Sequence, residues 1–423
     1  MEWTLHVSKQ PFPSYLDSMT NDLPLLSLEF LSLALVGVVL VVATSGKMRQ
    51  AVFLAVNLVF LGTMLLGIRG TLSTIAFVLL GYLLVVAARQ SKRWGLTVGA
   101  SALVILFAYM RNYSFLHWVA PESLLTGVLA TVGLSFLLFK ILHVAIEAQS
   151  QTLGPFDFVS YLNYCLNFTT FMMGPIQRYQ DYREQWTGER EAIPLTLEAH
   201  LDAVIRILFG LFRAFVLGAW IQPYMMVWGT NVASGSLGQI LVQVYAFYFF
   251  LYFNFGGYCD VAIGLGSLLG VRPPENFNKP FLSRNISDFW LRQHRTLTLW
   301  LTDYVFTPSL KRNLRLSVFR GHSSLAVAAS LMVTMLVSGL WHGTTVGFLL
   351  FGLAHGLLLV IYHLWDAWLI RRWGRPRLAQ WRKQPLVIAG GIFLTFNATA
   401  LAFVFFQLGA REGLQLFVRL LPR

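Results

Sequence analysis

Charged side chains are scarce in this chain. Only 12% of its 423 residues are Asp, Glu, Lys or Arg, whereas soluble domains average roughly a quarter. At the same time, 56% of the residues are hydrophobic. A soluble protein of that composition would expose large apolar patches. The composition therefore excludes an ordinary soluble domain and indicates that the lipid bilayer is the solvent.

Cysteine and the common catalytic motifs are also scarce. The two cysteines, Cys165 and Cys259, lie in apolar surroundings, which excludes a disulfide framework and a cysteine-rich metal site. The sequence has no H-E-x-x-H zinc motif and no G-x-S-x-G nucleophile elbow. The glycines of residues 264–270 lack the Lys-Ser or Lys-Thr of a phosphate loop. We therefore predict neither a metal site nor a resident cofactor.

What the chain has instead is a series of long apolar runs, each near the roughly 20 residues of a spanning helix. They cover residues 27–44, 51–67, 72–88, 96–110, 123–146, 203–221, 238–253, 325–350 and 386–409. We predict an all-α, polytopic integral membrane protein with about ten to twelve membrane segments, some of them re-entrant or interfacial. Residues 1–26 would be an extracytoplasmic segment, and residues 27–423 a single membrane-embedded domain.

The net charge of +13 indicates orientation in the membrane rather than nucleic-acid binding. Basic residues gather in the cytoplasmic loops of membrane proteins. Lys47 and Arg49 follow the first apolar run, and Arg89, Lys92 and Arg93 follow the third. These two loops would share the cytoplasmic side, which places the N-terminus outside.

Three regions interrupt the pattern of apolar runs. Residues 149–185 mix aromatic and polar residues, as interfacial or re-entrant segments do. Residues 369–385 contain six basic residues and two Trp, and we interpret them as a cytoplasmic surface loop. Residues 251–315 are the richest in polar and charged side chains, so they must lie in the interface or line a cavity within the bundle.

The third of these regions contains a predicted helix over residues 286–301. Asn285, three positions before Asp288, is typical of a helix N-cap. Spacings of four then predict that Trp290, His294 and Thr298 share one helix face.

Histidine is the candidate catalytic residue, because a buried ionisable group is costly in a membrane and indicates function. His342 lies in the apolar stretch S-G-L-W-H-G, and His294 lies 48 positions earlier. Two segments folded back together would bring both imidazoles into one cavity, where an imidazole is suited to deprotonating a hydroxyl. For His143, His355 and His363 we predict polar contacts between helices, with Glu147 the expected partner of His143.

Several long motifs resemble one known family. YFNFGGYCDVAIGLGSLLGVRPPENFNKPF (252–281), SDFWLRQHRTLTLWLTDYVF (287–306) and SGLWHG (338–343) are similar to the membrane-bound O-acyltransferase family. The likeness is greatest to its bacterial branch, which includes the alginate O-acetylation and teichoic-acid D-alanylation membrane proteins. The resemblance runs from about residue 130 to 360, more than half of the chain.

The resemblance implies a multi-spanning helical bundle around a central tunnel, and a catalytic pair. The two characteristic histidines of the family fall on His294 and His342. His342 would be the base or the acyl-handling residue, and His294 would orient the substrate. The residues implied to support the site are Asn276, Asn278, Asp260, Trp290, Asp303, Tyr304 and Trp341.

The function implied is transfer of a short acyl group, first of all acetyl, to hydroxyls of a cell-envelope polysaccharide. The donor would be a cytoplasmic acyl thioester such as acetyl-CoA or an acyl carrier protein. The acceptor would be reached directly or through an extracytoplasmic partner, and the protein would lie in the bacterial cytoplasmic membrane. D-alanyl transfer to teichoic acid is the alternative within this class. A small-molecule transporter or channel is the alternative from another class.

Overall fold

The computed structural model describes residues 27–65, 67–90, 93–113, 133–187, 196–226 and 235–420. Over these ranges the chain forms helices and no strand, which confirms the all-α prediction. Six helical segments there are long and apolar enough to cross a bilayer: Gly70–Gln90, Leu197–Met225, Leu237–Leu268, Ser323–His342, Val346–Trp373 and Pro385–Ala402. Residues 1–26 lie outside the described ranges, so their extracytoplasmic placement and the exact number of membrane segments stay predictions.

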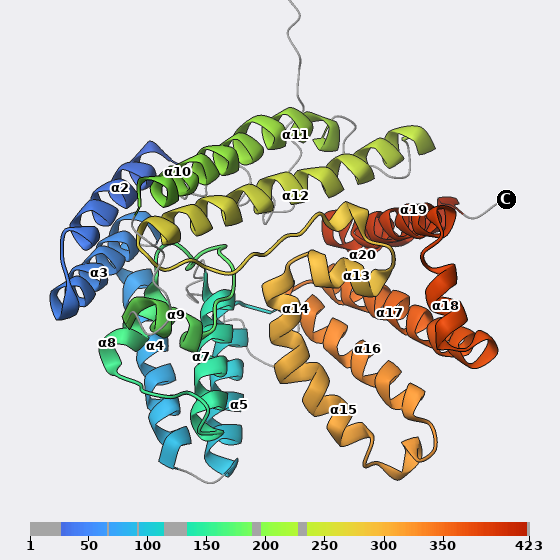
Figure 1. Cartoon of the computed structure of the whole chain (residues 1–423), viewed down its shortest axis with the longest axis horizontal. Coiled ribbons are helices and arrows are strands. Elements are labelled where there is room, and N and C mark those ends of the chain that lie inside the picture. The colour runs from blue at the N-terminus through green and yellow to red at the C-terminus, as the bar shows by residue number, and fades with distance from the viewer. Residues whose placement is uncertain are drawn as a thin grey trace, which may run out of the picture.

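The first half of the chain forms one helical group, drawn in colours from blue to green in Figure 1. Its core is aromatic: the rings of Phe30, Phe53 and Phe60 surround Phe168, with centroids 5.7 to 6.5 Å from it. Its helices are α2 (Leu28–Val42), α3 (Gly46–Phe60), the π-helical turn η2 (Leu61–Leu65), α4 (Gly67–Gln90), α5 (Arg93–Met110), α7 (Leu134–Gln149), α8 (Phe158–Leu166) and α9 (Tyr179–Thr187).

The second half forms another group, drawn in orange and red. The predicted N-cap is confirmed, because Asn285 Oδ1 accepts the backbone N–H of Asp288 at 2.9 Å. The elements are η5 (Pro280–Leu282), α13 (Ile286–Arg292), α14 (Arg295–Leu301), η6 (Thr302–Phe306), α15 (Thr307–Asn313), η7 (Ser317–Phe319), α16 (Ser323–His342), α17 (Val346–Trp373), α18 (Arg375–Trp381), α19 (Pro385–Ala402) and α20 (Val404–Leu420).

A long helix, α12 (Leu237–Leu268), joins the two groups across the top of Figure 1. Its C-terminal half packs Val261 and Leu265 into the first core, and its N-terminal half packs Phe247 and Leu251 into the second. α10 (Leu197–Leu211), η4 (Phe212–Gly218) and α11 (Ala219–Met226) run beside it. A third, smaller cluster of aromatic and aliphatic side chains from α7, α14, α16 and the loop before α9 lies between the groups.

Two apolar runs that we treated as single spans are broken, and that prediction is corrected. The run over 325–350 is interrupted at Gly343–Thr345, between α16 and α17. The run over 386–409 is interrupted at Phe403, between α19 and α20. Composition did not reveal either break, because neither Gly343–Thr345 nor Phe403 contains a charged residue or a proline.

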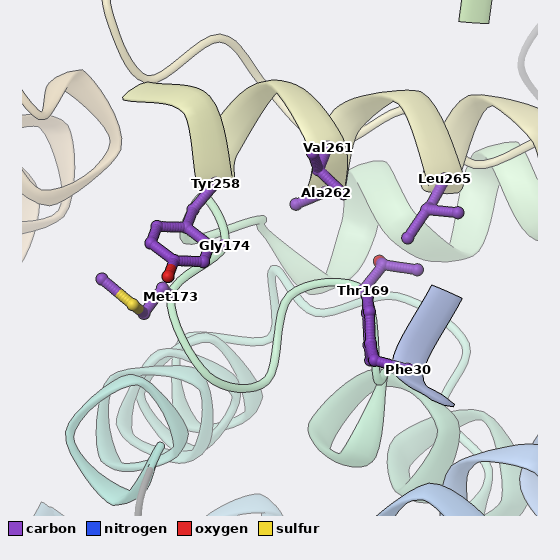
Figure 2. A pocket seen from close by; sticks show the side chains of 8 residues that line it. All are labelled: Phe30, Thr169, Met173, Gly174, Tyr258, Val261, Ala262 and Leu265. Carbon is purple, nitrogen blue, oxygen red and sulfur yellow. The ribbon is translucent and has the colours of Figure 1, made fainter. Parts of the chain in front are cut away.

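A small cavity marks the junction of α2, the loop after α8 and α12 (Figure 2). Its volume is about 10 Å³, room for about one water molecule. The lining residues are mostly apolar: Phe30, Thr169, Met173, Gly174, Tyr258, Val261, Ala262 and Leu265.

Glycines allow α16 and α17 to pack backbone against backbone. A Cβ added at Gly352 would collide with the carbonyl oxygen of Met335 and lie 3.3 Å from the Cα of Gly339. We predict that Gly352→Ala lowers the free energy of unfolding by about 1–3 kcal/mol, as overpacking does. Gly390→Ala in α19 is the matched control, because nothing lies within 4 Å of its added Cβ. Thermal unfolding in detergent checks this, and equal melting temperatures for the two variants would contradict it.

Candidate active site

Two histidines from different segments meet in the structure. His342 is the last residue of α16, and His294 lies between α13 and α14. Their ring centroids are 6.2 Å apart and their planes make an angle of 64°. His294 is 4% exposed, and His342 is partly buried. The structure thus brings together the two segments that the sequence analysis paired.

Aromatic rings surround both imidazoles. Trp341 lies 4.8 Å from His342 and 5.8 Å from His294, measured between ring centroids. Phe255 of α12 packs edge-on against His294 at 4.9 Å, and Phe351 of α17 packs against His342 at 5.5 Å. Burial lowers the pKa of His294 well below its usual range, and nearby His342 acts in the same direction. His294 is therefore a neutral imidazole at neutral pH.

The prediction of a single helix over residues 286–301 is wrong. The chain leaves the helix after Arg292, Gln293 is extended, and His294 has a left-handed backbone with φ 46° and ψ 49°. Trp290 and His294 consequently do not share a helix face. A left-handed conformation is rare for a residue other than glycine, and it persists only where the surroundings determine it.

Backbone hydrogen bonds on both sides of His294 hold this break in place. The N–H of Asn278 donates to the carbonyl of Arg292 at 2.9 Å, and the N–H of Arg295 donates to the carbonyl of Asn276 at 2.8 Å. The non-helical segment after α12 therefore lies directly against the break. Because that segment lies outside residues 286–301, the spacing of residues within this range could not reveal the break.

The side chain of Asn276 determines which nitrogen of His294 carries the proton. Its Oδ1 accepts the backbone N–H of Thr296 at 3.2 Å, the Thr296 hydroxyl at 2.8 Å and Nδ1 of His294 at 3.1 Å. A backbone N–H can only donate, so the atom it meets is the amide oxygen, and the His294 nitrogen facing that oxygen must also donate. The proton thus lies on Nδ1, and Nε2 is left as an acceptor.

Trp341 forms a fixed wall beside the two histidines. Its Nε1 donates to the carbonyl of Ser135 at 3.1 Å, and its ring stacks on Phe139 at 5.2 Å with an angle of 10°. Trp300 also stacks on Phe139, with the two ring centroids 3.9 Å apart. Trp341 therefore lies in the site, as the sequence analysis expected, and its indole nitrogen bonds to protein.

Trp290, in contrast, faces a third histidine. Its ring lies 5.0 Å from His355, which is 0% exposed. Neither nitrogen of His355 has a hydrogen-bond partner among the described residues, so the polar contact predicted for it is wrong. Phe351 lies 4.6 Å from His355 and 5.5 Å from His342. The spacing of four between Phe351 and His355 was the signal that could have placed this histidine near the site.

Asp303 and Tyr304 belong to a separate polar cluster around His143. The N–H of Tyr179 lies 3.0 Å from Nε2 of His143, and the Tyr304 hydroxyl lies 2.7 Å from Nδ1. That hydroxyl donates to Glu147 at 2.6 Å. Glu147 is thus linked to His143 through Tyr304, not directly as predicted. Asp303, which is 57% exposed, pairs with Arg178.

The other two predicted site residues do not reach the histidines. Asp260 is held by Arg206 and Arg213 between α10, η4 and α12. Asn278 is exposed and contributes its backbone N–H rather than its side chain. Of the residues implied to support the site, Asn276 and Trp341 are in direct contact with the histidine pair.

A larger polar cavity lies between α13, α16 and α17. Its volume is about 480 Å³, within the range of small-molecule sites. Leu359 lines it one helical turn from His355. Its polar lining residues are Asn285, Ser287, Asp288, Tyr362, His363 and Asp366.

Comparisons with known proteins identify the family of the chain. The family model "MBOAT, membrane-bound O-acyltransferase family" matches residues 53–407. The chain is 28% identical to a teichoic acid D-alanyltransferase of Bacillus subtilis, over 80% of this chain and 88% of that protein. It is 30% identical to a probable alginate O-acetylase of Pseudomonas syringae, over 65% and 52% respectively. It is 28% identical to a peptidoglycan O-acetyltransferase of Helicobacter pylori, over 59% and 44%.

The two neighbouring asparagines should respond differently to the same substitution. Asn276→Leu leaves the buried donors of Thr296 without an acceptor, so we predict a loss of about 2–4 kcal/mol in the free energy of unfolding. Asn278→Leu removes only an exposed side chain, so we predict a change within about 0.5 kcal/mol. Denaturant titration in detergent measures both. Equal losses for the two variants would show that Asn276 does not hold the break at His294.

Proposed function

Because the chain belongs to the membrane-bound O-acyltransferase family, we propose that it moves a short acyl group from a cytoplasmic thioester to hydroxyls of a cell-envelope polysaccharide. Acetyl is the first candidate for the acyl group, and transfer is direct or through an extracytoplasmic partner. The family makes the protein an O-acyltransferase, which removes the support for a transporter. The observation that carries the proposal is the pair of imidazoles, 6.2 Å apart between aromatic walls.

His342 is assigned as the general base. Its ring nitrogen accepts the proton of the acceptor hydroxyl while the hydroxyl oxygen attacks the thioester carbonyl carbon. The carbon–sulfur bond then breaks, and the thiolate takes the proton from the imidazolium. The products are an ester on the acceptor and a free thiol on the donor. The surrounding rings exclude water, which protects the thioester from hydrolysis.

His294 is assigned a supporting role because its protonation is already determined. With the proton on Nδ1 and that proton bound by Asn276, the free Nε2 is an acceptor only. It can accept a hydrogen bond from a substrate O–H or N–H and so orient that group toward His342. His294 is thus the positioning imidazole and His342 the proton-transferring one.

The polar cavity supports an approach of the donor from the basic side of the protein. Leu359 lines the cavity one helical turn from His355 on α17, and Phe351 contacts both His355 and His342. Beyond the cavity, α17 continues into the basic segment 371–383, which the distribution of charge predicts to be cytoplasmic. Acetyl-CoA and acyl carrier proteins present phosphate groups, which arginine and lysine bind well.

D-alanyl transfer is the second candidate. The similarity to the teichoic acid D-alanyltransferase covers 88% of that relative, whereas the similarity to the alginate O-acetylase covers 52% of its length. This greater coverage favours D-alanyl transfer, because the chain matches the D-alanyltransferase over more of that relative's length. Both candidates place the protein in the bacterial cytoplasmic membrane and use the same two histidines.

The test is acyl transfer by purified protein in nanodiscs, with labelled acetyl-CoA or a D-alanyl carrier protein as donor. The acceptors are oligomeric alginate and polyglycerol phosphate. We predict that His342→Ala lowers turnover by about 10²- to 10⁴-fold with whichever donor the wild type uses, because the base is lost.

His322→Ala is the matched control, since His322 is an exposed histidine just before the other end of α16. This control should retain wild-type turnover. Wild-type turnover by a folded His342→Ala protein would refute the catalytic assignment. If the acceptors received label from the D-alanyl carrier protein but not from acetyl-CoA, acetyl would be excluded as the acyl group and the second candidate would be supported.

A further inference from the structure

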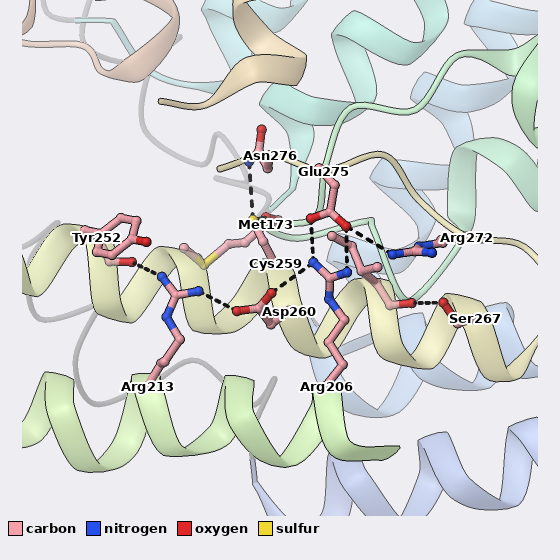
Figure 3. A network of polar contacts seen from close by, with 11 residues as sticks. Met173, Arg206, Arg213, Tyr252, Cys259, Asp260, Ser267, Arg272, Glu275 and Asn276 are labelled. Carbon is pink, nitrogen blue, oxygen red and sulfur yellow. Dashed lines mark hydrogen bonds and ion pairs between the residues drawn. The ribbon is translucent and has the colours of Figure 1, made fainter. Parts of the chain in front are cut away.

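A network of three arginines and two carboxylates lies between α10 and α12, close behind the site (Figure 3). Asp260 of α12, 13% exposed, binds Arg206 at 3.1 Å and Arg213 at 2.5 Å. Arg206 also binds both oxygens of Glu275, at 2.6 and 2.5 Å. Arg272 meets Glu275 at the outer rim at 3.3 Å. The bidentate pair of Arg206 and Glu275 is the most constrained contact of the network.

Arg213 and Asp260 are largely buried, at 9% and 13% exposed, whereas Glu275 is 41% exposed, so the Arg206–Glu275 pair adds little to the free energy of unfolding. A bidentate pair of arginine and carboxylate nevertheless adds geometric specificity, because two parallel hydrogen bonds fix how the partners lie relative to one another. Burial opposes the ionisation of Glu275, yet hydrogen bonds from Arg206 hold its pKa below the usual range. The carboxylate therefore stays charged and keeps its guanidinium partner.

The contact between α10 and α12 does not depend on this network. Gly210 and Gly257 let the two backbones touch, since a Cβ on Gly210 would lie 2.7 Å from the carbonyl oxygen of Gly257. Ile207 packs against Gly264 further along the same interface. The helices would remain together if the ion pair were removed.

The ion pair of Arg206 and Glu275 instead holds the segment that positions His294. Glu275 and Asn276 are consecutive in a non-helical segment, and their side chains reach different partners. Glu275 binds Arg206 of α10, and Asn276 binds His294 through Oδ1 and Cys259 through Nδ2. Figure 3 shows Glu275 and Asn276 side by side above α12, with Arg206 reaching Glu275 from below.

We propose that Arg206 and Glu275 are positioning residues for the reaction: their ion pair sets the place of Asn276 and, through Asn276, the orientation and tautomer of His294. This inference rests on the proposed role of His294. Neither residue touches the substrate. Loss of the pair lets the Glu275–Asn276 segment shift, so that Nε2 of His294 no longer aims at the substrate while His342 is unaffected.

The test is a double-mutant cycle on the full-length protein in nanodiscs, with the labelled donor and acceptor that the wild type uses. We expect Glu275→Gln to lower kcat by about tenfold without changing the donor KM. The reason is that a displaced His294 loses its contact with the transition state. Asn276→Ala should lower kcat by at least as much. The double variant should be no slower than Asn276→Ala alone, since the ion pair acts only through Asn276.

Arg272→Gln is the matched control, because it removes a rim arginine that is 56% exposed and should retain wild-type kcat. A second readout does not depend on activity: the ¹⁵N signals of the His294 ring, assigned by their loss in His294→Ala. These should show the Nδ1–H tautomer in wild type and a mixture of tautomers in Arg206→Lys, which keeps the charge but loses the bidentate geometry.

The inference would be overturned if the loss of kcat in the double variant equalled the product of the losses in the two single variants. Wild-type kcat in Glu275→Gln, or an unchanged His294 tautomer in Arg206→Lys, would overturn it as well. Failure of the proposed function looks different. In that case the wild type would acylate neither acceptor from either donor, while the tautomer of His294 would still respond to Arg206→Lys.

Discussion

Three hydrogen bonds converge on the side-chain oxygen of Asn276, and the position of His294 depends on them. They come from the N–H and hydroxyl of Thr296 and from the imidazole itself. A left-handed histidine between two short helices costs on the order of 1–3 kcal/mol. Three bonds to one buried oxygen, together with the backbone bonds on both sides of the break, offset that cost. The strained residue is therefore held rigidly where a functional imidazole is needed.

The rest of the fold serves to bring a second imidazole to this point. The N-terminal and C-terminal groups each bury an aromatic core of their own, and α12 belongs to both. The third cluster, with Trp341 and Phe139 stacked at 5.2 Å, fills the space between them. His342 enters from the end of α16, where the chain must turn at Gly343. Two imidazoles in an aromatic enclosure can handle a proton and a thioester without water.

The sequence was sufficient for the membrane class, for the helical fold and for bringing the segments of His294 and His342 together, while the catalytic role of the two histidines stays a prediction. Those features depend on local composition and on motifs. It was insufficient for the break at His294, because the spacing of Trp290, His294 and Thr298 satisfies a helix while the contacts that break it come from Asn276 and Asn278. The linkage of Tyr304 to His143 is likewise a contact between residues 161 positions apart. Tertiary hydrogen bonds overrode local periodicity in both places.

The central claim is that His294 and His342 form one site that holds the reacting carbonyl. The most direct measurement is a cryo-EM structure of the protein with a thioether analogue of acetyl-CoA, whose carbonyl cannot be transferred. We predict that the analogue's carbonyl lies between the two imidazoles, with a ring nitrogen of His342 within about 4 Å of it. Binding of the analogue with its carbonyl away from both rings, for example in the polar cluster around His143, would contradict this assignment of the site.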